Sequence, residues 1–259
     1  MYYGRPLIRT CDACEVDSRG ITWDDVRDST PYQRIIASYF SGSLCTLCLT
    51  EAKNPSCRST EKEAVGRLVG ILLSTDLEDI LTIVADECYD KELVVSTIPQ
   101  FSDPYVGMYT VPRLMSEHES LSFRDVGELI DSGICKKDGA KTKYGEQHAK
   151  LSALLDLTHI KRVGSRYLVS ISPIGESFMH MEGRLRDRLL VRLIFRIPII
   201  RTIWRDVEHG EVFIRDMLEA ADMTPSTAER RSYSIMQLFE FIRAHSPESI
   251  ASKSQSIHR

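Results

Sequence analysis

Two Cys-x-x-Cys motifs near the N-terminus restrict the fold of this chain more than any other feature. Cys11 and Cys14 form the first motif, and Cys45 and Cys48 form the second. The turn within such a motif lets both thiolates bind one ion, and two motifs together supply the tetrahedral Cys₄ shell of structural zinc. A module of about 60 residues has a small core, so metal binding adds to its folding free energy. The sequence therefore predicts a module over residues 1–60 that binds one Zn²⁺.

Other interpretations of this region remain open. The total of seven cysteines is odd, which disfavours a disulfide framework. Cys57 is close enough in sequence to replace one of the four zinc ligands. Glu51 and Lys53 resemble the Glu-x-Lys signature of restriction-type nucleases, in which a carboxylate binds Mg²⁺ and the lysine positions the attacking water. An aspartate at position 24, 25 or 28 would complete that site, so an Mg²⁺-dependent nuclease is an alternative function.

Composition is typical of a globular protein rather than a membrane or disordered one. Hydrophobic residues make up 42% of the chain and charged residues 27%. Arginines interrupt the apolar runs before any of them reaches the ~20 residues of a membrane span. The first residues lack the apolar core of a signal peptide. We therefore expect a soluble, cytoplasmic protein with no membrane partner.

Charge is distributed unevenly along the 259 residues, although the net charge is only −4. Residues 71–135 carry thirteen acidic and three basic side chains, whereas residues 136–259 carry twenty-one basic and fifteen acidic ones. Such asymmetry is typical of a chain whose basic half meets a polyanion. A surface on which both signs are merely solvated is the alternative interpretation.

The order of elements after residue 112 indicates a DNA-binding architecture. A helix is predicted over residues 121–130, a lysine-rich turn follows, and a second helix is predicted over residues 143–155. Gly164-Ser165 then separates two runs that have β propensity, which is a hairpin signal. Helix, turn, helix and basic hairpin is the order of a winged helix, whose second helix enters the major groove.

The charges around these elements suit contact with DNA. Residues 136–166 hold eight basic and three acidic side chains, and clustered cations neutralise phosphates. His148 is expected to be a core-edge residue rather than a metal ligand, because no second ligand lies at a suitable spacing. The side chains expected to contact DNA here are Lys141, Lys143, Gln147, Lys150, Lys161, Arg162 and Arg166.

The C-terminal third is predicted to be helical and to hold a second helix-turn-helix. Ser172-Pro173 supplies a cap for a helix expected to run to Arg196, with a solvated arginine every four residues from Arg184. The last helix is predicted to start at Thr224-Pro225. Its outward stripe, expected to contact DNA, consists of Thr227, Arg230, Arg231 and Ser234.

Several segments carry a resemblance to a known kind of protein region. They are Tyr144-Gly-Glu-Gln-His-Ala-Lys150, Leu154-Leu-Asp-Leu157, Tyr167-Leu-Val-Ser-Ile-Ser-Pro-Ile-Gly175, residues 188–198 and Ser226-Thr-Ala-Glu-Arg-Arg231. Together they resemble the tandem winged-helix regions of prokaryotic DNA-interacting proteins, which accompany restriction-type nucleases and some ATPases. The chain departs from that pattern at Asp156, where such sequences usually have glycine.

We therefore expect an α+β fold that is mainly helical, with winged helix-turn-helix domains and a small zinc-binding module. The expected parts are residues 1–60 (zinc module), 61–110 (acidic helical connector), 111–180 (first winged helix), 181–247 (second, winged-helix-like domain) and 248–259 (tail). Double-stranded DNA is the expected partner, and association as a homodimer or with a partner protein is an alternative interpretation. The expected function is a transcription regulator or the DNA-recognition component of a defence or restriction system. A protein–protein adaptor built on winged helices is a further alternative.

Overall fold

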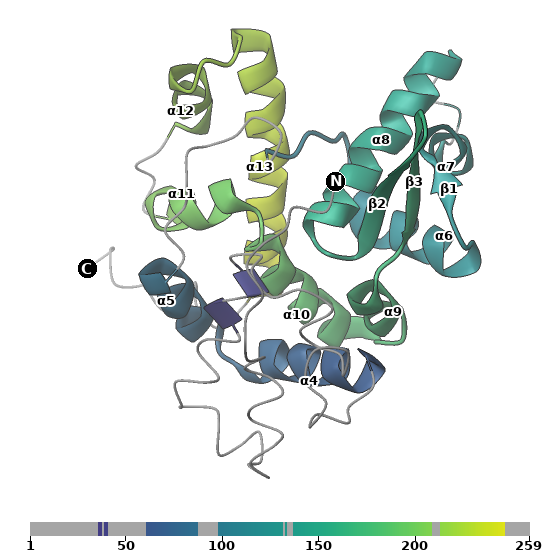
Figure 1. The fold of residues 1–259 in the computed structure, drawn as a ribbon. Helices are drawn as coiled ribbons and strands as arrows, with labels where there is room; N and C mark the ends of the chain where they lie inside the picture. Colours follow the sequence, from purple (N-terminus) through teal and green to yellow (C-terminus); the bar gives the residue numbers. More distant parts are fainter. Residues whose placement is uncertain are drawn as a thin grey trace. The chain divides into compact units, whose positions relative to one another are not determined.

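The computed structural model describes residues 36–37, 39–40, 61–87, 98–131, 133, 137–208 and 213–246 (Figure 1). The chain divides into two compact units, residues 1–89 and residues 90–259. The described residues are mainly helical and include one small antiparallel sheet, as expected for an α+β fold. Among them, none of the helices combines the length and the apolar character that a membrane span requires.

The first unit is described mainly by two consecutive helices, α4 (Glu61–Ser74) and α5 (Leu77–Glu87). One side of α5 is apolar and buried, since Leu77, Ile80, Leu81 and Val84 recur at helical spacing and are all buried. Acidic residues follow the start of α5, where the free amides of a helix favour negative charge. Residues 36–37 and 39–40 are helical and buried as well.

The second unit begins with helices that lead into the sheet. The π-helical turn η4 continues into helix α6 without a break in the helical backbone. The elements of this part are η4 (Val106–Thr110), α6 (Val111–Glu117), β1 (Leu121–Ser122), α7 (Phe123–Ile130), α8 (Asp138–Leu154), β2 (Thr158–Val163) and β3 (Arg166–Ile171). The sheet order is β1-β3-β2, and both strand pairs are antiparallel.

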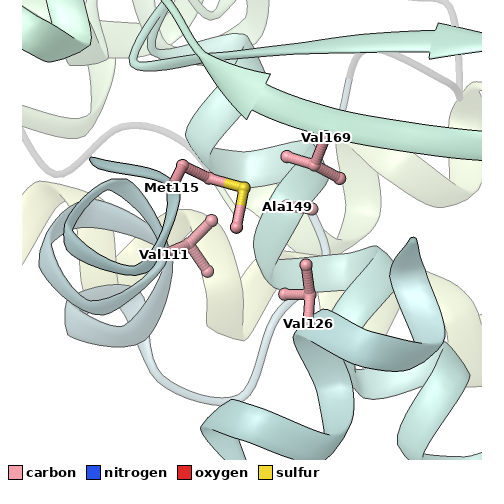
Figure 2. Packing of buried hydrophobic residues seen from close by; sticks show 5 residues of the cluster. All are labelled: Val111, Met115, Val126, Ala149 and Val169. Carbon is pink, nitrogen blue, oxygen red and sulfur yellow. The ribbon is translucent and has the colours of Figure 1, made fainter. Parts of the chain in front are cut away.

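A compact apolar core joins three helices to the sheet (Figure 2). Val111 and Met115 come from α6, Val126 from α7, Ala149 from α8 and Val169 from β3. All five side chains are essentially buried, and burial of an aliphatic side chain contributes roughly 1.5–3 kcal/mol. This core holds α8 against the sheet, whose strands β2 and β3 form the hairpin.

The start of α7 differs from the helix predicted over residues 121–130. Leu121 and Ser122 pair with Val169 and Leu168 of β3, so the helix begins two residues later than expected. Ser122 then caps α7, because its Oγ accepts from the backbone N–H of Asp125 while the Asp125 carboxylate accepts from the backbone N–H of Ser122. This reciprocal capping box satisfies two backbone donors at the helix start.

Glycines allow α7 and α8 to approach through their backbones. A Cβ added to Gly127 of α7 would lie 2.0 Å from the carbonyl oxygen of Lys141. A Cβ added to Gly145 of α8 would lie 2.1 Å from the carbonyl oxygen of Phe123. Neither contact leaves room for a methyl group, because the obstructing atoms belong to the backbone rather than to a flexible side chain.

Within the residues that the structure describes, five further helices follow in the second unit, and the break between the first two corrects a prediction. The helices are α9 (Pro173–Met179), α10 (Gly183–Ile194), α11 (Pro198–Glu208), α12 (Ile214–Ala220) and α13 (Pro225–His245). The prediction of a single helix from Pro173 to Arg196 is wrong, because the chain turns between α9 and α10. Gly183 has φ +47°, a left-handed conformation in which glycine lacks the steric penalty of other residues.

We predict that Gly145→Ala lowers the free energy of unfolding by about 3 kcal/mol or prevents folding, since overpacking against rigid backbone is costly. Gly139 in the same helix is the control, because a Cβ there would meet nothing within 4 Å. Gly139→Ala should stabilise the protein by about 0.5–1 kcal/mol through the higher helix propensity of alanine. Urea denaturation followed by circular dichroism measures both values. Equal effects of the two substitutions would contradict the close backbone contact.

Candidate nucleic-acid interface

Helix α8 has one buried side and one exposed side, and three of its residues expected to contact DNA form a polar stripe on the exposed side. Lys143 and Lys150 are exposed, and Gln147 between them is half-buried. His148 and Ala149, on the opposite side, are buried. The spacing of three and four residues places Lys143, Gln147 and Lys150 along one face of the helix.

Lys141 does not belong to this stripe. Its backbone carbonyl faces Gly127 of α7, and its side chain is half-buried. Helical geometry places position 141 near the side that faces α7, because it lies four residues before the buried Gly145. The structure therefore separates Lys141 from the other three predicted residues of α8.

A carboxylate that the sequence analysis did not include among the site residues also lies beside the stripe. Glu146 Oε1 lies 2.6 Å from Lys150 Nζ, one helical turn away. Its signal in the sequence was the i, i+4 spacing of glutamate and lysine, which is a common helix-stabilising pair. Because of this ion pair, the positive charge of Lys150 is already partly neutralised by a carboxylate of the same helix.

The hairpin β2–β3 carries its three predicted cations on two faces. In the register, Lys161 lies opposite Leu168, Arg162 opposite Tyr167 and Val163 opposite Arg166. Because side chains alternate along a strand, Lys161 and Arg166 share one face and Arg162 shares the other with Tyr167. Gly164 has φ +61° at the turn, as expected for a two-residue hairpin loop.

Aromatic stacking supports the hairpin. The Tyr167 ring stacks on the Phe123 ring of α7 at a centroid distance of 5.6 Å and an interplanar angle of 17°. Arg162 Nε donates to the carbonyl oxygen of Gly164, 3.2 Å away, across the turn. All three predicted cations of the hairpin are exposed. The structure thus presents them near a tip that is held against α7.

An acidic group lies close to the hairpin cations. The hydrogen bond from Ser122 is the largest cause of the lowered pKa of Asp125, and the positive charges of Arg124 and Arg166 lower that pKa further. Arg124 itself pairs with Glu128 at 3.0 Å. The surface of α7 next to the hairpin therefore carries both signs of charge, whereas the hairpin tip is basic.

His148 lies in the interior, as expected for a core histidine. Its ring is fully buried, its Nε2 lies 3.4 Å from Ser102 Oγ, and the Tyr144 ring packs edge-on at 4.5 Å. Burial lowers the pKa of His148 to about 4, so the ring is neutral at physiological pH. Within the described part of the chain, no three His, Cys, Asp or Glu side chains gather where they could hold a metal ion.

The outward stripe predicted for α13 is only partly exposed. Ser234 is fully buried, and its hydroxyl accepts from the backbone N–H of Phe101 and donates to the Phe101 carbonyl oxygen. Arg231 Nη1 donates to the carbonyl oxygen of Ile98 at 2.7 Å. The expectation of an exposed Ser234 is therefore wrong, because the segment that precedes η4 covers this part of the helix.

The start of α13 remains accessible. Arg230 is exposed, and its Nε donates to the carbonyl oxygen of Ser226. Thr227 is half-buried and accepts from the hydroxyl of Thr224 at 3.0 Å. Of the four predicted residues of this helix, the structure leaves Arg230 as the exposed one.

The arginines that recur every four residues from Arg184 differ in exposure along α10 and just after its end. Arg184 and Arg188 are exposed, but Arg192 is 4% exposed and donates to the carbonyl oxygen of Arg188. Arg196 forms an ion pair with Asp156 at 3.1 Å. The prediction of a solvated arginine face is therefore wrong for the second half of this series, because α10 enters the interior of the unit there.

The residues of the predicted zinc site and of the alternative nuclease site lie outside the described residues. These are Cys11, Cys14, Cys45 and Cys48 for zinc, Cys57 as a replacement ligand, and Glu51 and Lys53 for the nuclease. Comparison of the chain with protein-family models, curated proteins and solved structures finds no match. The geometry of α8 and its hairpin is therefore the main guide to function.

The buried His148 predicts a pH dependence of stability. Its folded pKa of about 4 lies below the ordinary value of 6.5, so the unfolded chain binds a proton between these values and the folded chain does not. Stability from this group is complete above pH 6.5 and falls by about 3 kcal/mol as the pH drops to 4. His148→Gln should remove this part of the slope of unfolding free energy against pH.

The exposed His159 provides a control for that measurement. His159→Gln makes the same substitution at an exposed position, so it shows how much of any change in slope comes from replacing a histidine by glutamine in general. The wild-type protein gives a second readout, because the ring protons of His148 should show no titration by NMR until the pH falls below 5. Titration near pH 6.5, or equal slopes for both variants, would contradict a buried neutral ring.

Proposed function

We propose that this protein binds double-stranded DNA through helix α8 and the β2–β3 hairpin. Its role would be that of a transcription regulator or the DNA-recognition component of a defence or restriction system. The observation that carries the proposal is the exposed stripe of α8, with Lys143, Gln147 and Lys150, on a helix that shares one core with a basic hairpin. Lys143 and Gln147 on this stripe point away from the core, because the opposite side of the helix packs in it.

The order of elements supports the same proposal. Helix α6, strand β1, helices α7 and α8 and the hairpin follow one another in the order of a winged helix, and β1 adds to the β3 edge of the hairpin. In that architecture the second helix of the helix-turn-helix lies in the major groove and the hairpin contacts the backbone. Along the chain, α8 is in the position of the second helix and β2–β3 is in the position of the hairpin.

We assign different roles to the two groups of residues. Lys143 and Gln147 are proposed to face base edges, since lysine suits guanine and glutamine suits adenine. Lys161, Arg162 and Arg166 are proposed to contact phosphates, which position a protein without reading sequence. Thr227 and Arg230 at the start of α13 would supply a further backbone contact, and Arg231 would stabilise the segment at Ile98.

A structural zinc site completes the proposal for the first unit. Four thiolates from Cys11, Cys14, Cys45 and Cys48 form a donor set that zinc prefers, and a closed shell of this kind is structural rather than catalytic. We expect about one Zn²⁺ per chain. Cys45→Ser should abolish zinc binding and unfold this module, because the binding energy of the metal is its folding energy. Unchanged zinc content in that variant, measured by atomic emission, would exclude Cys45 as a ligand.

A protein–protein adaptor is a second candidate, favoured by two exposed aromatic side chains. Phe213 at the start of α12 is 77% exposed, and Tyr233 of α13 is 62% exposed. Aromatic residues are enriched in protein interfaces. A chain that binds no duplex but co-purifies with a defined partner would favour this function over DNA binding.

The dependence of DNA affinity on salt tests the leading proposal. We predict that Arg162→Gln with Arg166→Gln reduces the slope of log affinity against log salt concentration by about 1.8, since each lost phosphate contact contributes ~0.9. The loss of affinity should be similar for all duplex sequences, because phosphate contacts carry no base information. Fluorescence anisotropy with labelled duplexes at several salt concentrations measures the slope.

Two exposed arginines of α10 give a control with the same change in net charge. Arg184→Gln with Arg188→Gln should leave the slope within about 0.3 of the wild-type value, because the proposed interface does not include them. Equal reductions in both double variants would show that the hairpin makes no particular contact. An absence of duplex binding at low salt would refute DNA binding altogether.

A further inference from the structure

We propose that Glu146 determines the sequence specificity of α8 by accepting a hydrogen bond from the exocyclic amino group of cytosine in the major groove. This inference rests on the proposed binding of duplex DNA. It goes beyond that proposal because it assigns base selection to a carboxylate, whereas the other charged residues of the proposed interface are basic.

Glu146 lies beside the exposed stripe of α8. It follows Lys143 by three residues and precedes Lys150 by four, so all three lie within the same two turns on one side of the helix. Its side chain is 35% exposed, and that of Lys150 is 58% exposed. The buried side of α8, which includes Gly145 and His148, faces the core instead. Any duplex that contacts Lys143 and Lys150 therefore also meets the carboxylate of Glu146.

A carboxylate at this place opposes non-specific binding for two reasons. It repels phosphates directly, and it pairs with Lys150 at 2.6 Å, so the lysine is not available as a free cation. A protein that bound only the backbone would gain affinity from a neutral residue at position 146, because each released counterion adds to binding. The carboxylate becomes favourable only where the DNA offers a hydrogen-bond donor.

The major groove offers such a donor on cytosine. Cytosine presents its N4 amino group there, and glutamate is the side chain that typically accepts from it. Adenine presents its N6 amino group beside the N7 acceptor, a pair that suits the amide of asparagine or glutamine rather than a carboxylate, which has no donor for N7. When Glu146 turns to that amino group, Lys150 is released toward a phosphate or a guanine oxygen. The pair thus stays closed on a sequence without cytosine and opens on one that has it.

Selection from a random duplex library tests the inference. The wild-type protein should enrich cytosine at one position, and Glu146→Ala should lose this enrichment while the other selected positions are kept. The variant should also bind an alternating dA-dT duplex roughly eightfold more tightly at 0.1 M salt, with a salt slope steeper by ~0.9, since Lys150 then neutralises a phosphate. Both changes are required, because removal of a negative charge alone explains only the second.

Helix α12 contains a closely matched control pair. Arg215 Nε lies 2.7 Å from Glu219 Oε1 at the same spacing, with side-chain exposures of 52% and 34%. Glu219→Ala should change neither the enrichment nor the slope. Cytosine enrichment that persists in Glu146→Ala, or equal changes in both variants, would overturn the inference while DNA binding stands. A wild-type protein that binds no duplex would instead refute the proposed function, and the inference with it.

Discussion

Helices α7 and α8 touch through their backbones, because glycine occupies the facing positions 127 and 145. The contact places α8 close to α7 and leaves Ala149 and Val126 room to pack together with Val169 of the sheet. The buried side of α8 takes part in this packing, and Lys143, Gln147 and Lys150 lie on the opposite side. The exposed stripe is thus a consequence of how closely the two helices meet. The hairpin depends on the same contact, since Tyr167 stacks on Phe123 of α7.

Polar contacts join this part of the second unit to its C-terminal helices. The Tyr109 hydroxyl of η4 donates to an Asp187 oxygen of α10 at 2.6 Å, and burial and that bond both raise the pKa of the phenol. Asp156 has φ +59° after the end of α8, and its carboxylate pairs with Arg196 after the end of α10. Ser234 binds both the N–H and the carbonyl of Phe101. These contacts hold α8 and α13 within one unit.

The sequence predicted elements whose signals are local, and it failed where tertiary contacts decide. The hairpin at Gly164 follows from turn chemistry and was predicted correctly. The break before Gly183 was missed, because glycine near the start of an amphipathic run does not by itself reveal a left-handed conformation.

Ser234 was misplaced for a related reason. A serine beside arginines suggests an exposed face, but the segment at Phe101 lies 133 residues away in sequence and covers it. Periodicity carries no information on such a distant segment. The polar residues of α8 were easier to place, since the apolar side of the same helix identifies the opposite face. Glu146 was overlooked as a site residue because its pairing with Lys150 looks like ordinary helix stabilisation.

The central claim is that α8 and the β2–β3 hairpin form one surface that binds duplex DNA. Backbone amide chemical shifts, recorded by NMR with and without a short duplex, test this claim most directly. We predict the largest changes on residues 143–150 and 161–167, with smaller ones at the start of α13. Changes concentrated on α12 and α13, with α8 unaffected, would contradict it.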